Sequence, residues 1–246
     1  MGYWLVKAVL SPILRLLFRP TITGGQHLPV SGGAILAGNH TTFIDNLIIP
    51  MVVPRRVRFL AKSDYFTGRG PKGWLSRRFF SGVGMIPLDR SGGKASEQAI
   101  DTGLAVQESG GLLGLYPEGT RSPDGRLYRG KTGVARMALE AGVPVIPVGL
   151  VGMSQIQPSG GGLPKIAKVE VRIGRPLDFS RYAGMEDDRF VLRSITDEIM
   201  YELMVLSGQE YVDTYAVKAK ADIELASRAA RESLVSDAPA PTRRAS

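Results

Sequence analysis

The stretch AILAGNHTTFID, residues 34–45, gives the first indication of the fold class. Its first four residues form an apolar run bounded by Gly33 and Gly38, which predicts a short buried strand. Similar runs follow at residues 57–61, 84–88, 111–116 and 145–150, and helical stretches lie between them at about 42–53, 74–81, 95–109 and 130–141. Because strands that alternate with helices form mainly parallel sheets, the sequence predicts an α/β fold with a single mixed, largely parallel sheet flanked by helices.

Further segments complete the expected domain organisation. Residues 169–173, VEVRI, alternate between polar and apolar side chains, which is typical of a half-exposed edge strand. Residues 186–206 and 208–233 have helical composition, and residues 236–246 have the composition of a disordered tail. We therefore expect a helix over residues 1–19, an α/β domain over residues 20–206, and a C-terminal helix with a disordered tail over residues 207–246.

The composition excludes several classes of protein. The 246 residues are 43% hydrophobic and include no cysteine, which excludes a disordered chain, a polytopic membrane protein, disulfides and a cysteine nucleophile. The net charge is +8, and residues 1–140 alone carry 18 Lys and Arg against 9 Asp and Glu. This basic front half predicts an anionic partner, which is a phosphate-bearing substrate, an anionic lipid surface or a nucleic acid.

The first 19 residues, MGYWLVKAVLSPILRLLFR, predict a helix that lies on a membrane. Polar side chains recur at every fourth position, and they are Lys7, Ser11, Arg15 and Arg19. Charges interrupt the segment too often for it to span a bilayer. A wide apolar face with a cationic stripe and an interfacial Trp4 instead predicts attachment to an anionic membrane surface, and we expect a peripheral protein at the cytoplasmic face of the cell membrane. The alternative is a helix packed on the protein's own core.

Directly after the first buried strand, the sequence places a histidine five residues before an aspartate. If a helix starts near Thr41 or Thr42, capped by a Thr hydroxyl, the carboxylate of Asp45 can turn back toward the ring of His40. Such a carboxylate holds one imidazole nitrogen and leaves the other able to take a proton. The pair therefore predicts a general base, with a purely structural hydrogen bond as the alternative. The other histidine, His27, lies in a Gly/Pro-rich turn with no carboxylate nearby in sequence.

A second polar group, YPEGTRS at residues 116–122, follows another predicted strand. It delivers Glu118, the flexible Gly119, the Thr120 hydroxyl and Arg121 to the carboxyl edge of the sheet, where α/β proteins place their ligands. Arginine offers a fixed fork of donors to phosphate oxygens, and a glutamate can accept from a hydroxyl. The loop therefore predicts a clamp for a phosphorylated ligand.

Together these motifs resemble the glycerolipid acyltransferase family, to which the 1-acylglycerol-3-phosphate (lysophosphatidate) acyltransferases belong. The family's N-H-x-x-x-x-D motif is similar to Asn39, His40 and Asp45, and its F-P-E-G-T-R-S motif is similar to residues 116–122, with Tyr116 in place of Phe. Two further motifs resemble residues 84–90 and 143–148. The four occur in the family's order over residues 39–150, so the match is specific.

The resemblance implies a role for each matching residue. It implies His40 as general base and Asp45 as its orienting partner. The positions that would bind the acceptor substrate are Lys62, Arg90, Glu118, Gly119, Thr120 and Arg121, of which Lys62, Arg90 and Arg121 match phosphate-binding positions. Pro147 lies in the motif that the family associates with the acyl donor. Thr42 stands where the family commonly has Ser, and both residues can cap a helix.

The activity that the resemblance implies is O-acyl transfer. A fatty acyl group would move from acyl-CoA or acyl-carrier protein to the hydroxyl of 1-acylglycerol 3-phosphate (lysophosphatidic acid), giving phosphatidic acid in phospholipid biosynthesis. The acyl thioester is a co-substrate, and we expect no metal and no bound cofactor, since two widely separated histidines without cysteine offer no metal-ligand spacing.

Other functions remain compatible with the sequence at this point. The same chemistry would serve glycerol 3-phosphate, a lysophospholipid or a glycolipid as acceptor, and a lipid-binding relative without activity is a further alternative. A basic nucleic-acid-binding protein would explain the charge, but it leaves His40, Asp45 and the YPEGTRS group unexplained, and no nucleic-acid-binding motif is present. We therefore expect no nucleic acid partner.

Overall fold

The computed structural model describes residues 2–89, 95–157 and 164–236, and it contains a seven-stranded sheet in the order β1-β8-β7-β2-β5-β3-β4. Its strands are β1 Thr21–Thr23, β2 Ala34–Gly38, β3 Val57–Lys62, β4 Met85–Leu88, β5 Leu112–Leu115, β7 Val145–Val151 and β8 Glu170–Ile173. Neighbouring strands are parallel except for β7 and β8. The predicted mixed, largely parallel α/β sheet is therefore confirmed.

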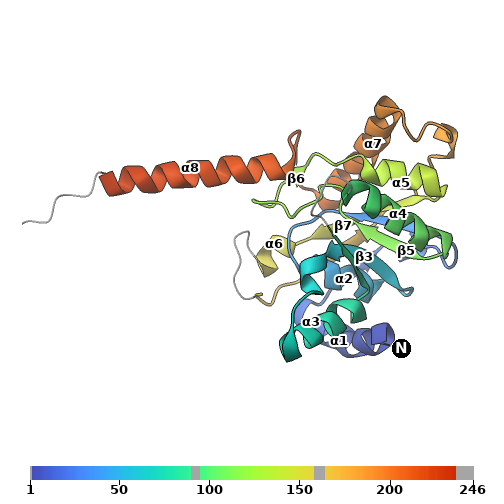
Figure 1. Ribbon diagram of the computed structural model, residues 1–246, viewed down its shortest axis with the longest axis horizontal. Helices are drawn as coiled ribbons and strands as arrows, with labels where there is room; N and C mark the ends of the chain where they lie inside the picture. The colour runs from blue at the N-terminus through green and yellow to red at the C-terminus, as the bar shows by residue number, and fades with distance from the viewer. Residues whose placement is uncertain (1, 90–94, 158–163, 237–246) are drawn as a thin grey trace, which may run out of the picture.

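Helices cover both faces of the sheet (Figure 1). They are α1 Gly2–Phe18, α2 Asp45–Val52, α3 Gly70–Gly82, α4 Ala95–Glu108, α5 Gly133–Ala141, α6 Met153–Ile156, α7 Arg189–Ser207 and α8 Ala216–Ser236, with short 3₁₀ turns at Gly25–His27, Ser63–Tyr65 and Ser180–Tyr182. Successive strand side chains point to opposite faces. Leu36 of β2 accordingly packs in the core beneath α1, α2 and α3, whereas Ile35 and Ala37 pack in the core beneath α4, α5 and α7.

The edge of the sheet differs from the prediction. Residues 169–173 were expected to form an edge strand, but β8 has a neighbour on each side, because β1 pairs with it in parallel and places Ile22 opposite Val171. The prediction is wrong because a three-residue strand is too short to produce an alternating pattern. The half-exposed character of β8 is confirmed, since Val171 and Ile173 are buried while Glu170 is exposed.

Several helix boundaries also differ. Helix α2 begins at Asp45 rather than at residue 42, and α3 begins at Gly70, four residues before the predicted start, with Pro71 in its first turn. The helix expected from residue 208 is preceded by a two-residue strand, β9 Tyr211–Val212, which pairs with β6 Leu127–Tyr128, so that α8 starts only at Ala216. The predicted tail beyond residue 236 lies outside the described residues.

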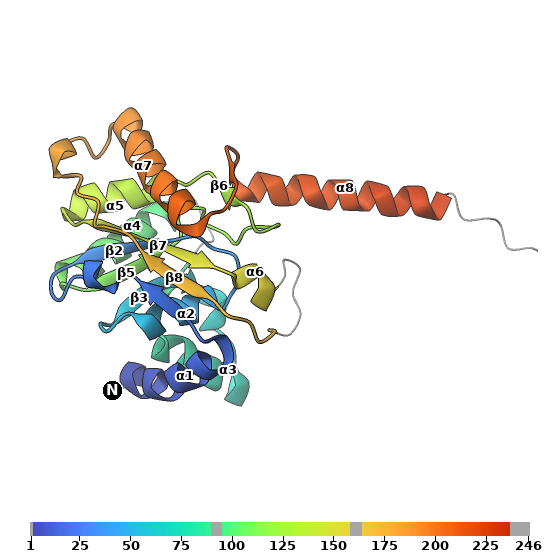
Figure 2. The same ribbon diagram turned by 180° about the vertical axis from the view of Figure 1, so that it is seen from behind.

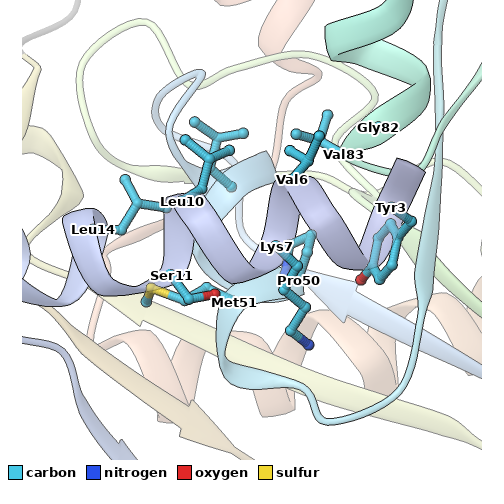
Figure 3. Close-up of a pocket in the computed structure, with 11 residues that line it drawn as sticks. Tyr3, Val6, Lys7, Leu10, Ser11, Leu14, Pro50, Met51, Gly82 and Val83 are labelled. Atoms are coloured by element: carbon cyan, nitrogen blue, oxygen red, sulfur yellow. The ribbon is translucent and has the colours of Figure 1, made fainter. Parts of the chain in front are cut away.

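Helix α1 packs on α2 and α3 through one face and exposes the other. Tyr3, Leu14 and Phe18 are buried. The cationic stripe is divided between the two faces, because Lys7 is half-buried and donates to the carbonyl of Val53, whereas Arg15 is exposed. Figure 3 shows Lys7 and Ser11 on the same side of α1 as Pro50 and Met51. Gly82 lets α3 approach closely, since a Cβ there would lie 2.6 Å from the side chain of Val6.

The outward face of α1 is apolar. Large apolar side chains are exposed along it, and they are Trp4, Leu5, Val9, Ile13 and Leu16. Packing on the protein's own core is therefore confirmed for one face of the helix, whereas membrane attachment through the outward apolar stripe stays a prediction. Within the described part of the chain, no helix has the length and apolar character needed to cross a membrane.

Candidate active site

The site starts where β2 ends, and Asn39 holds this end in place. Its side-chain amide donates to the carbonyl of Leu150 at 2.9 Å and accepts from the Leu150 N–H at 2.7 Å, as a neighbouring strand would. It also donates to the side chain of Gln209 at 2.8 Å. Asn39 is 1% exposed, so these bonds are shielded from water. They determine the direction in which the chain leaves the sheet and thereby position the next residue, His40.

The imidazole of His40 is held by a buried carboxylate. Its Nδ1 lies 2.8 Å from Oδ2 of Asp45, which is fully buried. The same oxygen accepts the backbone N–H groups of Thr41 and Thr42 at 2.7 and 2.8 Å, and Oδ1 accepts the Thr42 hydroxyl at 2.8 Å. Donation from Nδ1 fixes the tautomer and leaves Nε2 as the ring nitrogen that can accept a proton.

The expectation that a Thr hydroxyl caps the helix is wrong. Helix α2 starts at Asp45, its N-cap residue is Ile44, and the Thr42 hydroxyl donates to the Asp45 carboxylate instead of accepting from the backbone. The physical reason is that the helix begins only at Asp45, so both threonines precede the N-cap position, and the buried carboxylate draws the Thr42 hydroxyl to it as a donor. The sequence spacing nevertheless anticipated that the carboxylate turns back toward the ring of His40.

An aromatic stack, which sequence reasoning missed, supports the imidazole from one side. The ring of Tyr116 stacks on His40 with centroids 3.9 Å apart and planes 9° apart, and the ring of Phe59 stacks on Tyr116 at 5.5 Å. Phe59 can lie across β5 because residue 114 is glycine, where a Cβ would lie 2.2 Å from its ring. Burial raises the pKa of the Tyr116 phenol well above its usual value, and the charge of Asp45 acts in the same direction. Tyr116 is thus an uncharged aromatic ring that packs against the imidazole of His40 and restricts its movement.

Glu118 joins the two motifs. Its Oε2 accepts the N–H of His40 at 2.9 Å and its Oε1 accepts the N–H of Tyr128 at 3.0 Å. The N–H of Ser122 also donates to the carbonyl of His40 at 2.7 Å. Burial raises the pKa of Glu118 to about 7, although its two backbone hydrogen bonds act in the opposite direction. The structure therefore makes Glu118 a clamp between loops, and its predicted contact with the acceptor stays a prediction.

Positive charge gathers around the rest of the YPEGTRS loop. Gly119 has a φ of 72°, and a Cβ there would lie 3.0 Å from the side chain of Lys131, so only glycine fits without strain. The Thr120 hydroxyl accepts from Nζ of Lys220 in α8 at 2.7 Å, and Arg121 is exposed beside it. Lys131 and Lys220 were not among the predicted residues, because no local pattern marks either of them.

Three of the predicted site residues remain, which are Lys62, Pro147 and Arg90. Lys62 ends β3 at the same carboxyl edge of the sheet and forms an ion pair with Asp64. Pro147 is buried within β7 and lies opposite Ala37 of β2, so its place is inside the sheet and not in the YPEGTRS loop. Arg90 lies outside the described residues. Among the described residues, no three His, Asp or Glu side chains converge as a metal site would require.

Comparisons with known proteins agree on one family. A family model described as Acyltransferase matches residues 19–151, which is more than half of the chain. A chloroplastic 1-acyl-sn-glycerol-3-phosphate acyltransferase of Brassica napus is 30% identical over 162 residues, which cover 65% of this chain and 45% of that protein. The enzyme of the same name from Bacillus subtilis is 28% identical over 178 residues, covering 72% and 82%. The chain thus spans about half the length of the plant relative and most of the bacterial one.

A solved structure shares the fold. The crystal structure of the 1-acyl-sn-glycerophosphate acyltransferase from Thermotoga maritima has a TM-score of 0.61 to this chain, with 22% sequence identity, and the match covers 80% of this chain and 76% of that one.

Proposed function

The chain belongs to the acyltransferase family, and on this basis we propose that it transfers a fatty acyl group from an acyl thioester to the free hydroxyl of 1-acylglycerol 3-phosphate, giving phosphatidic acid. The observation that carries the proposal is the 2.8 Å hydrogen bond between His40 Nδ1 and the buried Asp45. The names of the relatives from Brassica napus and Bacillus subtilis support the acceptor.

In the proposed reaction, Nε2 of His40 takes the proton of the acceptor hydroxyl as its oxygen attacks the thioester carbonyl carbon. The new C–O bond gives a tetrahedral intermediate, which collapses with cleavage of the C–S bond. The thiolate leaves and receives the proton back from the imidazolium. The negative charge of Asp45 stabilises the imidazolium while it exists, and the stack with Tyr116 keeps Nε2 directed at the acceptor.

The chemistry needs no acyl-enzyme intermediate. The chain has no cysteine to form one, and it lacks the G-x-S-x-G pattern of serine acyl-enzymes. Direct transfer requires that the acceptor be held more firmly than water, which would otherwise hydrolyse the thioester. The cations around the YPEGTRS loop, with Arg121 foremost, support a site for the acceptor's phosphate.

Attachment to an anionic membrane surface belongs to the same proposal. The exposed apolar stripe of α1 supports it, and so do Trp74 and Leu75 of the neighbouring helix α3, which are 58% and 64% exposed. Lys72, Arg77 and Arg78 are exposed on the same helix. A surface that combines such apolar and cationic side chains suits the interface of an anionic bilayer, where a lyso-lipid acceptor resides. We propose that the chain attaches to the cytoplasmic face of the cell membrane, because its proposed co-substrates, the acyl thioesters, are available on that side.

Thiol release from palmitoyl-CoA in detergent tests the proposal. Because the chain contains no cysteine, a thiol reagent reports only released coenzyme A. We expect release that depends on lysophosphatidate and yields phosphatidic acid by mass spectrometry. Release without acceptor would make the protein a thioesterase, and equal release with glycerol 3-phosphate or lysophosphatidylcholine would refute the acceptor assignment. Acyl-carrier protein replaces the CoA ester in a parallel assay to identify the donor.

A further inference from the structure

Among the described side chains of helix α8, those at its beginning anchor it to the rest of the protein. Ala216 and Ala219 are buried against Tyr128, just after the pairing of β9 with β6. From there the helix runs away from the rest of the protein, as both views show (Figures 1 and 2), and residues 221–231 are exposed. The anchored turns contribute little apolar packing. Their position beside the YPEGTRS loop brings Lys220 to the Thr120 hydroxyl.

The last anchored residue, Lys220, points into the candidate active site. Its Nζ donates to the Thr120 hydroxyl at 2.7 Å, across 100 residues of sequence. It is half-buried, and burial lowers the pKa of Lys220, as does the positive charge of Arg121, while Glu118 acts in the opposite direction. Withdrawing an ammonium group from water is unfavourable unless an anion compensates for it.

The protein itself offers little such compensation. Both oxygens of the nearby Glu118 accept backbone N–H groups, and the pKa of this carboxyl is raised to about 7, so its charge is only partly present at neutral pH. Among the described residues, no carboxylate lies within ion-pair distance of Arg121, Lys131 or Lys220. Within the described part of the chain, the three cations thus lie around one loop without an ion-pair partner, which is the arrangement that a dianionic phosphate would neutralise.

We propose that Lys220 binds the phosphate of the acceptor together with Arg121, so that the C-terminal helix completes the acceptor site. The inference rests on the proposed function, since it assigns the phosphate to 1-acylglycerol 3-phosphate. In the structure, the Thr120 hydroxyl accepts the ammonium hydrogen bond. When the phosphate binds, its oxygens accept from the Lys220 ammonium, and the Thr120 hydroxyl can donate to them as well. Lysine suits this role because its ammonium is a compact charge on a long, flexible side chain.

The test compares Lys220→Met with Lys218→Met, which removes the same charge from an exposed position two residues earlier on the same helix. Calorimetry measures binding of the soluble 1-hexanoylglycerol 3-phosphate, with the uncharged 1-hexanoylglycerol as reference. We expect Lys220→Met to weaken binding of the phosphorylated ligand by about 10- to 100-fold, the usual effect of losing a hydrogen bond to a charged group. Lys218→Met should bind as the wild type does, and Lys220→Arg should restore most of the affinity.

Turnover provides a second readout that a merely structural role would not move. Lys220→Met should raise the KM for lysophosphatidate and leave kcat nearly unchanged. Melting curves check that each variant is folded, and Lys220→Gln replaces the Met variant if the latter aggregates.

The outcomes separate the two proposals. If the wild type transfers acyl groups and Lys220→Met binds the phosphorylated ligand as tightly as Lys218→Met does, the role of Lys220 is refuted and the function stands. If binding depends on Lys220 but no acyl transfer occurs, the function falls and the phosphate site stands. If the wild type does not bind the phosphorylated ligand more tightly than the uncharged one, the phosphate site itself is refuted.

Discussion

Replacing Asp45 by Asn tests how the carboxylate acts on His40. Oδ2 of Asp45 accepts three donors, which are Nδ1 of His40 and the N–H groups of Thr41 and Thr42, while Oδ1 accepts one hydroxyl. An asparagine must place its carbonyl oxygen at the Oδ2 position, because its NH₂ group there would face three donors. The NH₂ group then meets the Thr42 hydroxyl, which can accept from it. The variant therefore keeps the tautomer of His40 and loses only the charge.

The magnitude follows from this geometry. A hydrogen bond to a charged group contributes about 1.5–3 kcal/mol, against about 1 kcal/mol for a neutral pair. We expect the lost difference of about 0.5–2 kcal/mol to lower kcat by about 2- to 30-fold. Asp45→Ala instead leaves the buried donors of Thr41 and Thr42 without an acceptor, which should lower the free energy of unfolding by at least about 3 kcal/mol as well as reduce kcat further.

The assay is acceptor-dependent thiol release with saturating lysophosphatidate, accompanied by thermal and urea unfolding. Asp45→Asn should unfold nearly as the wild type does and retain measurable turnover. Equal losses of activity and stability in Asp45→Asn and Asp45→Ala would contradict this prediction. They would mean that the donors of His40, Thr41 and Thr42 do not orient the asparagine side chain.

Two further predictions concern pH and membranes. The unfolded chain releases the Glu118 proton near pH 4.5 and the folded protein holds it until about pH 7, so Glu118 ionisation lowers stability as pH rises through this window, by up to about 3 kcal/mol. Urea unfolding should show this fall in the wild type and a flatter profile in Glu118→Gln, whereas parallel profiles would contradict it. Leu16→Glu, on the outward face of α1, should weaken binding to phosphatidylglycerol vesicles about tenfold or more. The control Val30→Glu, at a 95% exposed position outside α1, should leave vesicle binding unchanged. Equal effects of the two substitutions would argue against α1 as the membrane contact.

Local patterns in the sequence were sufficient for most of the sheet. The apolar run that became β2 and its counterparts in β3, β4, β5 and β7 were predicted because each is a short, mainly apolar stretch bounded by turn residues, although β3 and β4 are only partly buried. The contact between Asp45 and His40 was also predictable, since it depends on residues five apart at the start of a helix.

Long-range packing accounts for what the sequence did not reveal. The ring of Phe59 can stack on Tyr116, which in turn stacks on His40, because Gly114 of the neighbouring strand has no side chain in that space. Lys220 meets Thr120 only because β9 pairs with β6 and anchors α8. Such contacts join residues far apart in the chain, so they produce no periodic sequence pattern from which they could be predicted. The inward turn of Lys7 likewise depends on α2, whose end supplies the carbonyl of Val53.

The turnover of His40→Ala, measured as lysophosphatidate-dependent thiol release from palmitoyl-CoA, tests whether His40 is the general base. If Nε2 of His40 is the base, kcat should fall by about 10²- to 10⁴-fold while the melting curve shows a folded protein. A folded variant with turnover near that of the wild type would contradict the account.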